Sequence, residues 1–244
     1  MYTYITPDML SCYITTLKNN GKSANTISSY TRNINKLVLF LDGSELSYKK
    51  MADYKDWLKS KGFKRRTVNA YLAAANYFCE VMGWQDMKVP LEQLDYNERH
   101  KPMCISLVNY NKLVYTALQN DNERLAMMIQ VLCHTDLRFC ELGLLTVEAL
   151  ETGVVYVQRK NHEIKIIIPG MILEDLNIYV KHNGIINGVI FRTKNGSLVN
   201  RSNFCKDLRK TCVTAGIDEN TGSIQHVKNV VMDGYPYYGL RTEI

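Results

Sequence analysis

Helix signals without any strand pattern fill residues 6–84 of this 244-residue sequence. Thr6 stands directly before Pro7, as an N-cap residue does before a proline in the first helical turn. Ser23 begins a second helix, whose apolar residues recur at steps of three and four. These residues are Ile27, Tyr30, Ile34, Leu37 and Leu41. Two more helices are expected over 48–59 and 66–82, so residues 1–87 are predicted to form a small four-helix domain.

The spacing of apolar residues changes in the second half of the chain, where strand patterns appear among the helical ones. Residues 88–102 are polar, carry prolines near both ends and show no period, which predicts a linker. Beyond it, helical patterns occupy four segments: 108–117, 124–133, 173–181 and 201–215. Patterns rich in β-branched residues occupy three more: 154–158, 163–168 and 189–191. The first two flank Lys160 and predict a β-hairpin, so residues 103–244 are expected to form a mixed, mostly helical domain.

Composition excludes several classes of protein. The sequence has no run of about eighteen apolar residues and no basic-then-apolar N-terminus, so we expect no membrane span, no secretion signal and a cytoplasmic location. The seven cysteines are scattered, odd in number and never spaced Cys-x-x-Cys. They are expected to be reduced thiols and not disulfides or zinc ligands. The net charge of +6 by itself favours a polyanionic partner only weakly.

One arginine lies inside an apolar pattern with helical spacing. Four leucines can line a buried face of such a helix: Leu132, Leu137, Leu142 and Leu145. Arg138 lies among them, and a charge in that position is costly unless it meets an anion. The anion is either a structural partner such as Glu141 or the ligand of a functional site. The nine residues from His134 to Leu142 favour neither alternative.

A basic cluster falls where the fourth helix is expected to begin. Its members are Lys59, Lys61, Lys64, Arg65 and Arg66. Amides at a helix N-terminus and neighbouring cations together attract phosphate groups. A charge run of this kind is more often a solvated face, so the cluster alone does not assign a partner.

Several of these segments resemble the tyrosine recombinase (phage integrase) family. The string Leu-Arg-x-x-Glu-Leu at 137–142, followed by Leu-Thr at 145–146, resembles the first catalytic box of that family. Ser23-x-x-Thr26-x-x-x-Tyr30 and the segment 66–69 resemble the paired helix starts of its DNA-clamping domain. The resemblance implies a mainly α fold with a small β-sheet. It consists of an N-terminal SAM-like four-helix core-binding domain and an α+β catalytic domain.

The same resemblance implies a chemistry and a set of partners. A tyrosine would attack a DNA phosphodiester without metal or cofactor, while Arg138 and His226 stabilise the phosphate and Lys160 protonates the leaving 5′-oxygen. Arg159 and Lys165 are alternatives to Lys160. DNA contacts would come from six residues at two helix starts: Lys22, Thr26, Lys64, Arg65, Arg66 and Thr67. The implied partners are double-stranded DNA, further copies of the chain in a tetramer on DNA, and accessory proteins.

The second catalytic box departs from the family pattern His-x-x-Arg. His226 is present, but Asn229 occupies the arginine position and Lys228 stands one residue early. Three tyrosines follow too soon, without a preceding Gly-His pair: Tyr235, Tyr237 and Tyr238. We therefore expect the family pattern to end near Asp218, through truncation or frameshift, and the catalytic domain to be C-terminally incomplete, with its nucleophile unassigned.

Three functions follow from these observations. The chain is a strand-transferring site-specific recombinase, or a DNA-binding relative that occupies recombination sites without cleavage. The third alternative is a helical interaction protein whose basic cluster is only a solvated face.

Overall fold

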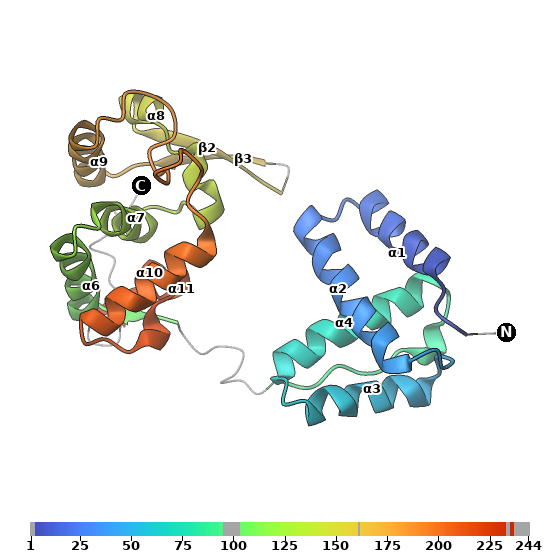
Figure 1. Ribbon diagram of the computed structural model, residues 1–244. Coiled ribbons are helices and arrows are strands. Elements are labelled where there is room, and N and C mark those ends of the chain that lie inside the picture. The colour runs from blue at the N-terminus through green and yellow to red at the C-terminus, as the bar shows by residue number, and fades with distance from the viewer. Residues whose placement is uncertain (1–2, 95–102, 161, 233–234, 237–244) are drawn as a thin grey trace. The chain divides into compact units, whose positions relative to one another are not determined.

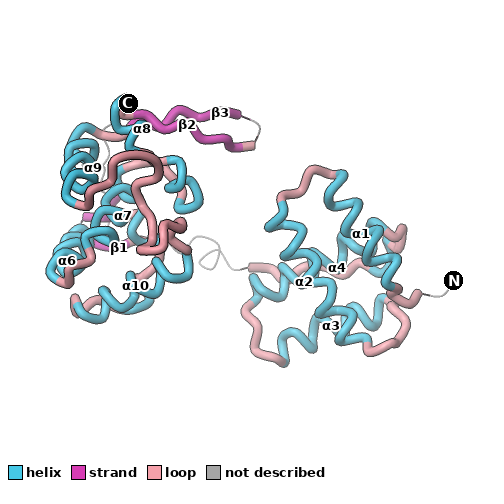
Figure 2. Tube along the Cα trace, turned by 45° about the horizontal axis from the view of Figure 1, so that its top comes forward, coloured by secondary structure: helices cyan, strands magenta, loops and turns pink. Residues whose placement is uncertain are grey.

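The computed structural model describes residues 3–94, 103–160, 162–232 and 235–236. The chain divides into two compact units between Lys101 and Pro102. In the described residues both units are mainly helical, and the strands form two small sheets within the second (Figures 1 and 2). The expected fold class, mainly α with a small amount of β-sheet, is thus confirmed. Within the described part of the chain, no helix is long and apolar enough to cross a membrane.

The first unit contains the four predicted helices. They are α1 (Pro7–Asn19), α2 (Ala24–Leu41), α3 (Tyr48–Ser60) and α4 (Arg65–Val81), followed by the 3-10 turn η1 (Gln85–Met87). Three of the helix starts are held by hydroxyl side chains that accept a backbone N–H, and these are Thr6, Ser23 and Ser47. The inward faces of the four helices form one core, which includes the fully buried Tyr13, Leu37, Tyr54 and Phe78.

The segment that follows η1 packs on the first unit. Asn76 forms two hydrogen bonds with the backbone of Val89, at 2.8 and 3.1 Å. Asn69, two turns earlier on the same helix, forms the same pair with the backbone of Glu92, at 2.8 and 2.7 Å. Val89 is buried in the core of the unit. The expected linker of 88–102 is therefore bound to α4 over its first part, and residues 95–102 lie outside the described residues.

The second unit combines short helices with two small sheets. Its helices are α6 (Leu107–Gln119), α7 (Glu123–His134), α8 (Val147–Thr152), α9 (Gly170–His182), α10 (Arg201–Thr214) and α11 (Ile224–Lys228). The 3-10 turns are η2 (Phe139–Leu144) and η3 (Glu219–Thr221). The strands are β1 (Ile105–Ser106), β2 (Val154–Arg159), β3 (His162–Ile167), β4 (Val230–Met232) and β5 (Tyr235–Pro236).

The strands pair as two separate sheets. β2 and β3 form the predicted antiparallel hairpin, in which Arg159 stands opposite His162. β1 runs parallel to β4, and β5 is antiparallel to β4. The strand expected over 189–191 does not form. Instead Val189 makes an isolated bridge to Thr146, and the ladder cannot extend because the chain enters α8 directly after Thr146.

Helix α7 is the centre of the second unit. Most of its residues are buried, and it packs against α6, α9, α10 and α11 (Figure 1). Leu132, Leu137, Leu142 and Leu145 are all buried in the same core, as their spacing predicts. This core fixes the segment that joins α7 to η2, which contains Arg138.

Candidate DNA phosphate site

The segment after α7 leaves the helix at Thr135. The Thr135 hydroxyl donates to the Val131 carbonyl at 2.7 Å and accepts the N–H of Leu137 at 3.2 Å. These bonds replace those that would continue the helix, so α7 ends at His134. The helix predicted over 124–133 thus ends one residue later than expected, and Arg138 lies in a turn although the apolar residues around it have helical spacing. The leucines remain buried because the turn, and not a helix, brings them back to the core.

Arg138 lies in the turn between α7 and η2, where it is the N-cap residue of η2, and its side chain is exposed. Its backbone N–H donates to Glu141 Oε2 at 2.8 Å, and the N–H of Glu141 donates back to the Arg138 carbonyl at 2.9 Å. Among the described residues, no hydrogen bond or ion pair holds its guanidinium group. The Arg138–Glu141 salt bridge considered above does not form. Arg138 is instead an exposed cation on a fixed backbone.

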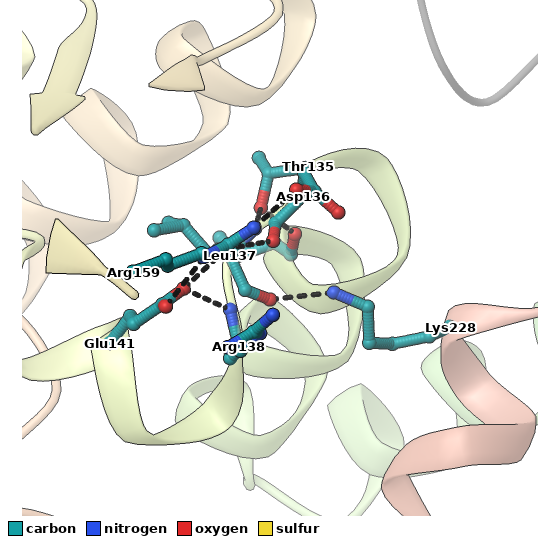
Figure 3. Close-up of polar contacts among 8 residues, drawn as sticks. Thr135, Asp136, Leu137, Arg138, Glu141, Arg159 and Lys228 are labelled. Atoms are coloured by element: carbon teal, nitrogen blue, oxygen red, sulfur yellow. Dashed lines mark hydrogen bonds and ion pairs between the residues drawn. The ribbon is translucent and has the colours of Figure 1, made fainter. Parts of the chain in front are cut away.

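Arg159, the last residue of β2, takes the place of Arg138 as the partner of Glu141. Its Nε lies 2.8 Å from Glu141 Oε1, and its Nη2 lies 2.6 Å from Glu141 Oε2 (Figure 3). Its Nη1 and Nη2 also bond to the carboxylate and carbonyl of Asp136, at 2.7 and 2.8 Å. The side chains of Arg159 and Glu141 are 11% and 10% exposed, so this is a nearly buried, bidentate ion pair.

Both members of this pair are charged at neutral pH. Burial raises the pKa of Glu141, but hydrogen bonds from Arg159 and from the Arg138 amide outweigh it, and the net pKa is lowered. The hydrogen bond to Glu141 is the largest cause that raises the pKa of Arg159 above its ordinary value. Arg159 is thus a fixed cation and cannot serve as a proton donor.

Helix α11 reaches the same turn from the opposite side. Lys228 Nζ donates to the Leu137 carbonyl at 2.6 Å, directly before Arg138 (Figure 3). His226, on the same short helix, has its Nδ1 at 2.8 Å from Ser223 Oγ. Burial lowers the pKa of His226, which favours a neutral imidazole at pH 7. Asn229, in the position of the family arginine, donates to the Met103 carbonyl at 3.1 Å.

Lys160 lies in the turn of the hairpin. It is exposed, and its φ of 48° is in the left-handed region, as the turn between β2 and β3 requires. Lys165 lies on β3 opposite Tyr156 and is also exposed. The ion pairs of Arg159 connect the start of the Lys160 turn to the Arg138 segment. They do not bring the Lys160 amine itself into that segment.

The candidate DNA-binding residues of the first unit form two groups. Four lie at the start of α4, where the N-cap residue forms no side-chain cap, and these are Lys64, Arg65, Arg66 and Thr67. Lys22 and Thr26 lie at the start of α2, where Thr26 Oγ1 is 2.8 Å from Ser23 Oγ. Tyr30 of α2 stacks edge-on against Tyr77 near the end of α4. Asn33, further along α2, bonds to the carbonyl of Ala70, which lies earlier on α4, so the two helices run antiparallel and the start of α2 lies towards the end of α4.

The carboxylate of Glu92 forms an ion pair with one member of the basic cluster of residues 59–66, Lys59. Glu92 Oε1 lies 2.8 Å from Lys55 Nζ and 2.9 Å from Lys59 Nζ. The hydrogen bonds from Lys55 and then Lys59 lower the pKa of Glu92 to about 2. The charge of Lys59 is therefore compensated by a carboxylate of the same unit.

Sequence reasoning missed two contacts of the Arg138 segment. Arg159 was considered only as an alternative to Lys160, and Lys228 only as a displaced arginine. No pattern in the sequence indicates that Arg159 pairs with Glu141, because 18 positions separate the two residues. The Lys228–Leu137 contact spans 91 positions and ends on a backbone carbonyl, so it leaves no signal at all.

Comparisons with known proteins agree on the fold. Residues 10–85 match the family model of the phage integrase N-terminal SAM-like domain. A sequence comparison with the curated proteins gave no match. Among solved structures, the chain is similar to a lambda integrase dimer bound to a COC′ core site. Sequence identity is 14%, the TM-score is 0.70, and the match covers 91% of this chain and 69% of that one.

Two further solved structures give the same result. The Tn1549 transposon integrase in complex with transposon right end DNA has 12% identity and a TM-score of 0.70, over 90% of this chain and 84% of that one. The XerH site-specific recombinase bound to its difH substrate has 14% identity and a TM-score of 0.64, over 92% of this chain and 72% of that one. Likeness at such low identity establishes a shared fold.

Proposed function

We propose that this chain, which begins with a phage integrase SAM-like domain and has the fold of the tyrosine recombinases, binds duplex DNA and holds one phosphodiester at Arg138. The observation that carries the proposal is the exposed guanidinium of Arg138 on a backbone held by Glu141. A guanidinium presents paired N–H donors that match two phosphate oxygens, and its charge is permanent.

The surroundings of Arg138 support a phosphate ligand. Lys228 adds a second cation on the same turn, and its contact with Leu137 holds α11 beside Arg138. The imidazole of His226 on that helix can donate a hydrogen bond to a phosphate oxygen through Nε2. Lys160, which is exposed at the hairpin turn, is the fourth candidate for a phosphate contact.

The first unit supplies a second group of phosphate contacts. No side chain caps the start of α4, and the helix dipole together with the basic residues Lys64, Arg65 and Arg66 favours an anion there. Relatives of the same fold have been crystallised on DNA as a dimer in the lambda integrase complex and as a tetramer in its Holliday junction complex. We accordingly propose that this chain also assembles as a homo-oligomer on double-stranded DNA.

The salt dependence of DNA affinity tests this function. The full chain is titrated onto a labelled 30-bp duplex of random sequence, and fluorescence anisotropy is followed from about 50 to 200 mM salt, over which proteins with several phosphate contacts lose on the order of 10³-fold in affinity. A steep, linear fall of log affinity with log salt is expected. A salt-independent affinity, or no binding, would contradict the proposal and favour an interaction protein with a solvated basic face.

Strand transfer is a second candidate function. β5, which contains Tyr235, pairs with β4, so the chain beyond α11 stays joined to the unit that holds Arg138. Tyr237 and Tyr238 lie outside the described residues. In this reaction the tyrosine oxygen would bond to phosphorus, the bond from phosphorus to the 5′-oxygen would break, and Lys160 would donate a proton to that oxygen.

A nicked duplex separates the two candidates. Cleavage next to the nick releases a short strand and traps the covalent protein–DNA adduct, which migrates slowly in a denaturing gel. An adduct that disappears in one of the variants Tyr235→Phe, Tyr237→Phe or Tyr238→Phe would establish strand transfer. Tight binding without an adduct would leave the chain as a DNA-binding protein that occupies recombination sites.

A further inference from the structure

Every nitrogen of the Arg159 guanidinium donates a hydrogen bond to Asp136 or Glu141, the residues on either side of Arg138. Nε and Nη2 bond to Glu141, Nη1 bonds to the Asp136 carboxylate, and Nη2 also bonds to the Asp136 carbonyl. The side chain is 11% exposed. A guanidinium with this set of partners has little capacity for a phosphate. Arg159 is therefore unsuited to contact DNA directly, although it lies next to two residues that are proposed to do so.

One carboxylate oxygen connects Arg159 to Arg138. Glu141 Oε2 accepts from Arg159 Nη2 at 2.6 Å and from the backbone N–H of Arg138 at 2.8 Å. Without Arg159, this nearly buried carboxylate would lose the cation that compensates its charge. It would then turn towards water or bind a proton, and in both cases the acceptor that fixes the Arg138 backbone would be weakened.

We infer that Arg159 is a positioning residue that sets two phosphate-binding groups at once. Through Glu141 it fixes the backbone from which Arg138 extends, and as the last residue of β2 it fixes the base of the turn that contains Lys160. The inference rests on the proposed function, since Arg138 is the phosphate contact in that function. Displacement of a catalytic or binding group by about 1 Å can reduce rates or affinities by as much as about 10²-fold.

Hydrogen exchange tests the structural half of the inference without DNA. Amide exchange at residues 136–141 is compared among the wild-type chain, Arg159→Lys, Arg159→Ala and the control Lys181→Ala, which removes an exposed charge on α9. Arg159→Lys keeps the charge but cannot form the forked contact, and it should raise the exchange rate at Arg138 about tenfold. Lys181→Ala should leave that rate unchanged. Unchanged exchange at Arg138 in Arg159→Lys would overturn the inference, even if Arg159→Ala fails to fold.

A double-mutant cycle tests the functional half. Affinity for the 30-bp duplex is measured for the wild-type chain, Arg138→Ala, Arg159→Lys and the double variant. Arg159→Lys should weaken binding about threefold to tenfold in the wild-type background and clearly less once Arg138 is alanine, because a large part of its effect acts through that residue. Equal losses in both backgrounds, or no loss in either, would overturn the positioning role.

The two measurements distinguish a failure of the proposed function from a failure of the inference about Arg159. If the wild-type chain does not bind the duplex, the proposed function is wrong, and the exchange rates alone then decide whether Arg159 orders the Arg138 backbone. If binding is normal and salt-dependent but the exchange rates do not respond, the proposed function stands and the inference about Arg159 is wrong.

Discussion

Arg159 Nη2 lies 2.6 Å from Glu141 Oε2, a contact that joins the hairpin to the turn after α7. Glu141 has a closer cation in sequence, Arg138, but it accepts only the backbone N–H of that residue. The carboxylate thus bonds to its own helix start on one side and to Arg159 on the other. The consequence is that Arg138 keeps its charge available for an external anion.

Glu141→Gln should destabilise the second unit. The substitution leaves the buried Arg159 guanidinium without a compensating charge, and breaking a buried pair in this way costs about 3–5 kcal/mol. We expect a loss of at least about 2 kcal/mol in the free energy of unfolding, since Asp136 still binds part of Arg159. Urea unfolding measures this loss. Glu174→Gln, an exposed residue of α9, is the control, and an equal effect of both variants would contradict the prediction.

The same pair predicts how stability depends on pH. The folded pKa of Glu141 is lowered, so its contribution to stability is complete above the unfolded pKa of about 4.3 and is lost as the pH falls below that value. Wild-type stability should therefore decrease more steeply than that of Glu141→Gln between about pH 5 and pH 3. Urea unfolding at several pH values gives both curves. Parallel curves would show that Glu141 makes no pH-dependent contribution.

Glu92 predicts a second acid transition, in the first unit. Its pKa is lowered to about 2 by Lys55 and Lys59, so the two ion pairs persist at neutral pH and weaken as the pH falls from the ordinary glutamate value of about 4.3 towards 2. The segment around Val89 should then exchange its amides faster. Hydrogen exchange at pH 5 and pH 2.5, corrected for intrinsic rates, checks this. Glu92→Gln should show the fast exchange already at pH 5, and a segment that is equally protected in both proteins would contradict the prediction.

The helices of the first unit could be predicted because their signals are local. Ser23 accepts the N–H of Thr26, within the same helical turn, and the apolar spacing from Ile27 to Leu41 alone specifies which face of α2 is buried. The attachment of residues 88–92 to α4 could not be predicted. It depends on Asn69 and Asn76 pairing with a backbone far along the chain, and an asparagine in a helix shows no preference for such a partner.

The candidate site was only partly predictable for a related reason. The burial of Leu137 and Leu142 follows from spacing, and the hairpin around Lys160 follows from β-branched residues. The end of the helix predicted over 124–133 agrees with α7 to within one residue, but the sequence did not identify the Thr135 hydroxyl, which competes with the helix for backbone bonds. The pairing of Glu141 with Arg159, 18 positions away, could be identified only from the structure.

Arg138→Ala should weaken DNA binding and leave stability unchanged. Its guanidinium has no hydrogen bond or ion pair among the described residues, so its removal should change the free energy of unfolding by less than about 0.5 kcal/mol. One phosphate contact fewer should reduce the slope of log affinity against log salt by about 1. Anisotropy titrations at four salt concentrations give the slope, with Lys181→Ala as the charge-matched control. An unchanged slope would place Arg138 outside the DNA interface.

Gly222→Ala should displace α11. A Cβ added at Gly222 would lie 2.8 Å from the Cα and 3.0 Å from the backbone nitrogen of Arg209, and a helix backbone cannot move aside as a flexible side chain can. The start of α11 must therefore shift away from α10, which costs about 1–3 kcal/mol as in other overpacked sites. Lys228 would also lose its bond to Leu137, so DNA affinity should fall together with stability.

Gly170→Ala is the matched control for this displacement. An added Cβ at Gly170, at the start of α9, meets no atom within 4 Å, so alanine there should be neutral or stabilise by about 0.5 kcal/mol. Urea unfolding and duplex affinity are measured for both variants. If the two variants behave alike, the close packing of Gly222 on α10 does not set the place of α11. If Gly222→Ala loses stability but keeps full affinity, α11 contributes to the fold and not to the phosphate site.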